Sequence, residues 1–143
     1  MRGQITGWVA RIAVAAVFAI NVQCALAFLL TPERYATGFE LDGVPGIAAV
    51  RGLGIAFMMW NATYPLVIWR PDRYRALFAV VLAQQAIGLV GEAWLLGTLP
   101  AGHDTLARSI TRFIAFDGSG LLVMAAAYVL LVGRVSDPGG HDE

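Results

Sequence analysis

Four long apolar runs, separated by short polar segments, constrain this 143-residue chain more than any other feature. Each run is long enough to cross about 30 Å of hydrocarbon at a rise of about 1.5 Å per helical residue. Lipid offers no partner to a free backbone amide, so an open chain can cross it only as helices. The sequence therefore predicts an all-α integral membrane four-helix bundle, with spans at about 8–30, 46–69, 76–99 and 109–133.

The composition and the prolines agree with this architecture. Charged residues make up 14% of the chain, against about 25% in a soluble domain. Prolines, which start or end helices, fall at the edges of the expected spans, at Pro32, Pro45, Pro71 and Pro100. We therefore expect one transmembrane domain over residues 1–135. Residues 136–143 form a short polar tail, which we expect to be disordered.

Arginine placement predicts the orientation. The loop between the second and third spans contains Arg70, Arg73 and Arg75. Short loops rich in Arg stay on the cytoplasmic side of a membrane. Because the number of spans is even, the N- and C-termini are then expected in the cytoplasm as well. The formal net charge is zero, so no basic field favours a nucleic acid as partner.

A faint internal repeat relates the second and fourth spans. Arg51-Gly-Leu-Gly-Ile-Ala-Phe-Met58 and Asp117-Gly-Ser-Gly-Leu-Leu-Val-Met124 both read charge, Gly, any residue, Gly, three apolar residues, Met. Such a pattern is typical of a tandem repeat of two helices, although chance matching in a Gly- and Ala-rich sequence gives the same appearance. A true repeat would place Arg51 and Asp117 at equivalent depths.

Charged and amide side chains occur at membrane depth in every expected span. A charge at the centre of a span costs roughly 2.5–3.5 kcal/mol, so these groups must face inward and pair, or face a pocket. We expect Glu92 to pair with Arg112 across the tight loop at Pro100, and Arg51 to pair with Asp117. The candidate ligand-binding residues are Arg51, Glu92, Arg112, Asp117, Gln85 and Asn61.

Helical spacing supports a shared polar face. Gln85, Gly88 and Glu92 follow the i, i+3, i+7 pattern of one side of a helix. The charges can equally form a structural ion-pair network that fixes the order of the helices. The sequence contains no pattern typical of a metal site, a phosphate-binding loop or a catalytic serine. We therefore expect no cofactor, no metal and no assigned catalytic residue.

The stretches AVRGLGIAFMMWN, QAIGLVGE and RFIAFDGSGLLV resemble bacterial four-helix membrane proteins of the BphX-like group. They are more distantly similar to DoxX-like four-helix membrane proteins. The resemblance covers roughly residues 5 to 133 and implies a multi-pass protein of the bacterial plasma (inner) membrane. The BphX-like group has no agreed activity, so the resemblance implies no catalytic residue.

Three functions remain open from the sequence. The first is a small membrane protein that binds a lipophilic small molecule, or serves as an accessory subunit, through its intramembrane Arg, Glu and Asp residues. The second is an intramembrane enzyme in which Glu92 or Asp117 acts as acid or base on a lipophilic substrate. The third is a small dimeric transporter. The expected partners are the lipid bilayer, a lipophilic ligand, and a second copy or a partner membrane subunit.

Overall fold

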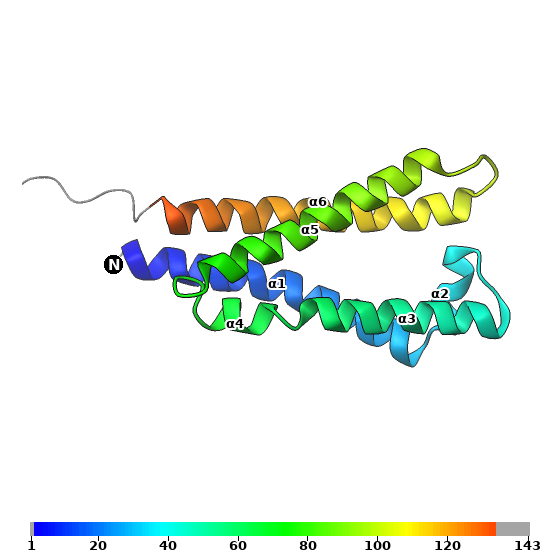
Figure 1. The fold of residues 1–143 in the computed structure, drawn as a ribbon, viewed down its shortest axis with the longest axis horizontal. Helices are drawn as coiled ribbons and strands as arrows, with labels where there is room; N and C mark the ends of the chain where they lie inside the picture. Colours follow the sequence, from blue (N-terminus) through cyan, green and yellow to red (C-terminus); the bar gives the residue numbers. More distant parts are fainter. Residues whose placement is uncertain (1, 134–143) are drawn as a thin grey trace, which may run out of the picture.

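The computed structural model describes residues 2–133 as an all-helical chain (Figure 1). The tail predicted over residues 136–143 lies outside the described residues. The elements in chain order are α1 (Arg2–Leu30), α2 (Glu33–Ala36), η1 (Thr37–Phe39), α3 (Gly43–Asn61), α4 (Tyr64–Trp69), α5 (Arg75–Thr98) and α6 (Asp104–Val132).

Four helical segments are long and apolar enough to cross a membrane, over Ile5–Leu30, Gly43–Trp69, Arg75–Thr98 and Asp104–Val132. They run alongside one another, with the connections gathered at the two ends (Figure 1). The expectation of an all-helical chain with four membrane-length helices is confirmed. The fourth helix begins at Asp104, one turn before the expected start of the fourth span.

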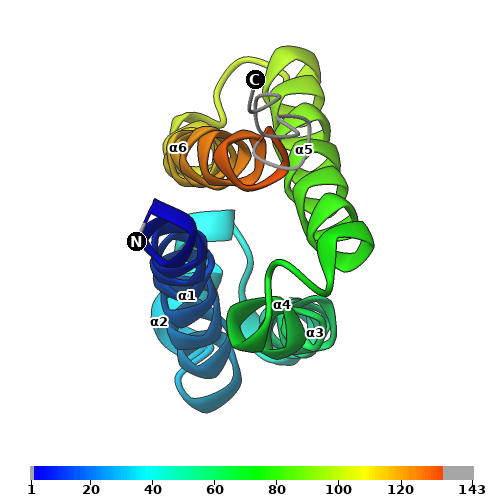
Figure 2. The same cartoon turned by 90° about the vertical axis from the view of Figure 1, so that its left-hand side faces the viewer.

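α1 holds the bundle together, because it packs against α3, α4 and α6. α5 packs along α6 and contacts α4, whereas α3 packs closely against neither α5 nor α6. Figure 2 shows the consequence, with α5 and α3 separated on one side of the bundle. The end of the bundle that holds residues 31–42 and 99–103 is called the loop end below.

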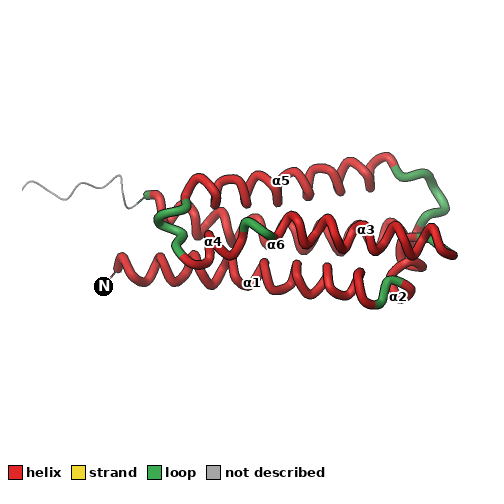
Figure 3. The backbone as a smooth tube through the Cα atoms, turned by 60° about the horizontal axis from the view of Figure 1, so that its bottom comes forward, coloured by secondary structure: helices red, strands yellow, loops and turns green. Residues whose placement is uncertain are grey.

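The second span is two helices and not one. α3 ends at Asn61 and α4 begins at Tyr64, with Pro65 in its first turn. Proline has no N–H, so the hydrogen bond that would reach back to the Asn61 carbonyl cannot form. The Asn61 carbonyl thus loses its usual helical donor, and the Asn61 side chain donates from Nδ2 to the Phe57 carbonyl oxygen one turn earlier, at 2.7 Å. Figure 3 shows the break as a short loop between α3 and α4.

Two apolar cores form, one toward each end of the bundle. The core farther from the loop end contains Val14, Tyr64, Phe78 and Met124, all fully buried. The core at the loop end is centred on Phe28, and its ring lies 5.0–6.3 Å, centroid to centroid, from the rings of Tyr35, Phe39, Phe57 and Phe113. Edge-to-face and offset ring pairs of this kind stabilise a core beyond their burial alone.

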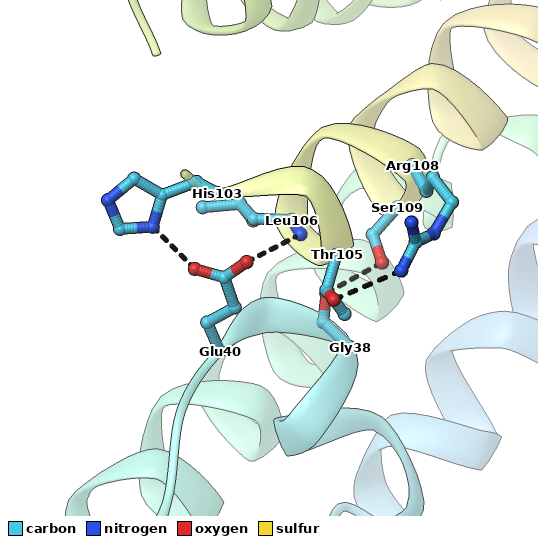
Figure 4. A network of polar contacts seen from close by, with 7 residues as sticks. All are labelled: Gly38, Glu40, His103, Thr105, Leu106, Arg108 and Ser109. Carbon is cyan, nitrogen blue, oxygen red and sulfur yellow. Dashed lines mark hydrogen bonds and ion pairs between the residues drawn. The ribbon is translucent and has the colours of Figure 1, made fainter. Parts of the chain in front are cut away.

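Glu40 ties the loop end to the start of α6 (Figure 4). Its backbone is left-handed, with φ of 54°, and its Oε1 accepts from the Leu106 N–H at 3.1 Å. The other oxygen pairs with the ring of His103. The first N–H groups of a helix have no partner within the helix, so Glu40 caps α6 from a distant segment. The hydrogen bonds from His103 and from the Leu106 amide hold the pKa of Glu40 below its ordinary value.

Candidate functional site

A cavity of about 310 Å³ lies between the two cores, and all four spans contribute to its wall. Its apolar lining consists of Ile20, Phe57, Trp60, Phe113 and Phe116. Its polar and small lining residues are Asn21, Cys24, Asn61, Gln85, Gly88, Glu92, Arg112 and Asp117. We call this space the central cavity.

Five of the six candidate residues line the central cavity: Asn61, Gln85, Glu92, Arg112 and Asp117. Residues from α3, α5 and α6 are thus brought to one place, although they are far apart in the sequence. Arg51 is the exception, because it lies exposed on α3 and does not line the cavity.

Neither expected ion pair is formed. Among the side chains described for residues 5–133, the one salt bridge joins His103 to Glu40. Arg112 turns toward the loop end, where its guanidinium donates to Ser109 Oγ at 3.4 Å. Similar depth in the membrane brought Glu92 and Arg112 to the same cavity, but depth does not determine where a long side chain points.

The pairing of Arg51 with Asp117 is also wrong. Arg51 is on an exposed face of its helix, whereas Asp117 Oδ1 accepts a hydrogen bond from Gln85 Nε2 at 2.7 Å. The repeat predicts equal depth for the two residues, but it does not determine how each helix is rotated about its axis, and the two side chains face in different directions. The tandem repeat itself stays a prediction.

A chain of hydrogen bonds crosses the bundle beside the cavity. The Tyr64 hydroxyl donates to Gln85 Oε1 at 3.2 Å, and Gln85 Nε2 donates to Asp117 Oδ1. Tyr64 is fully buried and Gln85 is 2% exposed. The chain links α4, α5 and α6 and fixes the orientation of the Gln85 amide. Tyr64 was missed in the sequence, where it reads as one more aromatic residue in an apolar run.

Two buried oxygen atoms at the cavity have no hydrogen-bond partner. Asn61 is 4% exposed, and its Oδ1 is unpaired while its Nδ2 is engaged with Phe57. Glu92 Oε2 is buried and unpaired as well. An unsatisfied buried polar group costs about 1–3 kcal/mol, and such groups are rare in folded proteins. Both atoms therefore keep an unused hydrogen-bond acceptor in residues of the cavity wall.

Glycines shape the cavity and the helix contacts. A Cβ on Gly88 would lie 2.9 Å from Asp117 Oδ2 and 3.3 Å from Trp60 Cη2, so the missing side chain makes room for both groups. A Cβ on Gly91 would meet nothing within 4 Å. Gly54 permits the close approach of α3 to α1, because a Cβ there would lie 2.9 Å from the Ala25 carbonyl oxygen.

A second cavity of about 330 Å³ lies nearer the loop end. It shares Cys24, Arg112 and Phe113 with the central cavity and adds Arg34, Tyr35, Ser109 and others. Arg112 therefore stands between the two spaces. In the part of the chain that the structure describes, no group of three or more His, Cys, Asp and Glu side chains is arranged to hold a metal ion.

Comparison with known proteins finds no matching family model, no matching curated protein and no matching solved structure. The resemblance to BphX-like and DoxX-like proteins stays a prediction. What the site can do is therefore judged from its geometry: it offers an apolar enclosure, several hydrogen-bond acceptors and two carboxyl groups.

Proposed function

We propose that this chain is a small multi-pass membrane protein that binds a lipophilic small molecule in the central cavity. The observation that carries the proposal is the unpaired, buried Asn61 Oδ1 in a cavity lined by five aromatic or aliphatic side chains. Small-molecule sites are mostly apolar, with a few well-placed polar groups, and have volumes of about 300–1,000 Å³.

The arrangement of the helices supports entry of the ligand from the bilayer. α3 does not pack closely against α5, and both contribute to the central cavity through Trp60, Asn61, Gly88 and Glu92. A molecule dissolved in lipid would reach the cavity between these helices without crossing an aqueous phase.

We infer that both termini face the cytoplasm of a bacterial plasma membrane. Guanidinium groups lie over aromatic rings near the end of the bundle opposite the loop end: Arg11 over Trp8 at 5.2 Å and Arg70 over Trp69 at 5.0 Å. Trp and Arg together at a helix end are typical of a membrane–water interface. The Arg-rich loop around Arg73 lies at that same end.

An intramembrane enzyme is the second candidate, and the unpaired Glu92 Oε2 favours it. A carboxyl group inside an apolar cavity is suited to proton transfer with a bound substrate. Turnover of a lipophilic substrate that disappears in both Glu92→Gln and Asp117→Asn would favour this function over binding alone. An accessory subunit and a small dimeric transporter remain alternatives from the sequence, and no contact in the structure favours either.

Cys24 provides a test of binding, because it lines the central cavity and is the chain's one cysteine. We expect a membrane-permeant maleimide to modify Cys24 slowly in native membranes and faster after extensive detergent washing removes the ligand. The matched control carries Cys24→Ala with Gln23→Cys, since residue 23 lies at the same depth on an exposed face. The rate at which the maleimide modifies this control protein should change much less on washing. Equal responses of the two proteins would contradict an occupied cavity.

A further inference from the structure

We propose that the ligand of the central cavity is a lipophilic organic cation that carries N–H donors, such as a protonated amine. This inference rests on the proposed function and names the chemical class that the same site would accept.

Hydrogen-bond acceptors converge on the cavity from three helices. Asn61 Oδ1 comes from α3 and Glu92 Oε2 from α5, and both are buried and unpaired. Asp117 comes from α6, and Gln85 bonds one of its two carboxyl oxygens. An ammonium group offers three donors and no acceptor, so one such group would match these three residues. A carboxylate or phosphate ligand supplies acceptors only, so it would leave Asn61 Oδ1 and Glu92 Oε2 unsatisfied.

The charges at the cavity point to the same class. Glu92 and Asp117 line the same cavity, and among the side chains described for residues 5–133 neither forms a salt bridge. Buried carboxylates need a counter-charge, because an isolated ion in an apolar medium is strongly disfavoured. Arg112 does not supply it, since its guanidinium is hydrogen-bonded to Ser109 toward the loop end. A monocation placed between the two carboxylates would give both an attractive partner and reduce the net charge of the group from −2 to −1.

The apolar wall suits an organic cation better than a metal ion. Phe57, Trp60, Phe113 and Phe116 line the same cavity, and aromatic faces attract organic cations. Two carboxyl groups alone do not make a metal site, and the described residues contain no larger cluster of metal-binding side chains.

Three naphthalene probes of nearly equal shape test the charge requirement. They are 1-naphthylmethylamine, 1-naphthylmethanol and 1-naphthoic acid, which are positive, neutral and negative near neutral pH. Binding is measured by equilibrium dialysis against the full chain in lipid nanodiscs, with protein-free nanodiscs subtracted. We expect the amine to bind at least about tenfold more tightly than the alcohol, the ratio for one charge-assisted hydrogen bond. The acid should bind least.

Variants of cavity residues test whether the preference for the amine over the alcohol arises in the central cavity. Glu92→Gln and Asp117→Asn should each weaken amine binding about tenfold or more and leave the alcohol nearly unchanged. Glu33→Gln, an exposed acid outside the cavity, is the matched control and should change nothing. Arg112→Gln should tighten amine binding, because it removes a positive charge from the cavity wall. Arg112 is exposed, so this variant remains informative if a carboxyl variant fails to fold.

The outcomes separate the ligand class from the proposed function. Equal binding of alcohol and amine, weakened for both by Gly88→Ala, would overturn the cation and leave a lipophilic binding cavity. Tightest binding of the acid, lost in Arg112→Gln, would overturn the cation in favour of an anion. No binding of any probe above protein-free nanodiscs would overturn the amine class, while Cys24 protection would still test whether the cavity is occupied.

Discussion

Adding one methyl group at Gly88 tests the geometry of the central cavity. The new Cβ would lie 2.9 Å from Asp117 Oδ2, closer than real Cβ contacts, so the carboxyl group must move. That movement strains the 2.7 Å hydrogen bond from Gln85 to Asp117. A hydrogen bond to a charged group contributes about 1.5–3 kcal/mol, whereas replacing Gly by Ala within a helix gains about 0.5–1 kcal/mol. Gly88→Ala should therefore lower the free energy of unfolding by about 1–2 kcal/mol.

Gly91→Ala is the matched control. It lies on the same helix, and a Cβ there meets no atom within 4 Å. Gly91→Ala should therefore raise the free energy of unfolding by the full helix-propensity difference of about 0.5–1 kcal/mol. Thermal unfolding of both variants in one detergent measures the difference, and Gly88→Ala should melt below wild type while Gly91→Ala melts at or above it. Equal melting temperatures for the two variants would refute the placement of Asp117 over Gly88.

Three further predictions concern the packing around the site. Tyr64→Phe leaves the buried Gln85 Oε1 without its donor and should reduce the free energy of unfolding by about 1–3 kcal/mol; a melting temperature equal to wild type would contradict the hydrogen-bond chain. Gly54→Ala should destabilise the protein by about 1–3 kcal/mol, because its Cβ meets backbone of α1, whereas Gly52→Ala, which meets nothing within 4 Å, should not. The pKa of Glu40 is held below its ordinary value of 4.5. The ionised carboxylate therefore stabilises the folded protein above that pH, and this stabilisation is lost as the pH falls through the lowered pKa. The difference in melting temperature between wild type and Glu40→Gln should therefore shrink below about pH 4.5, and a difference that grows on acidification would contradict it.

The helical architecture was predictable because lipid leaves the chain few choices. Apolar runs of membrane length must be helices, and polar residues at depth must avoid lipid. The expectation that polar residues avoid lipid correctly placed five residues at one cavity: Asn61, Gln85, Glu92, Arg112 and Asp117. It failed for Arg51, which is exposed on α3.

Side-chain direction and the helix break were harder to predict. Depth and spacing do not determine helix rotation, so neither expected ion pair formed. Pro65, inside the last third of the second apolar run, was a signal for the break that the sequence analysis did not use. The break matters for the site, because Asn61 ends α3 and Tyr64 begins α4.

Native mass spectrometry of the protein extracted in a mild detergent tests most directly whether the central cavity holds a small molecule. We expect a discrete added mass on wild type that is lost or greatly reduced in Glu92→Gln and retained in Arg51→Ala, since Arg51 does not line the cavity. A bare protein, or an adduct equally present in both variants, would contradict the account.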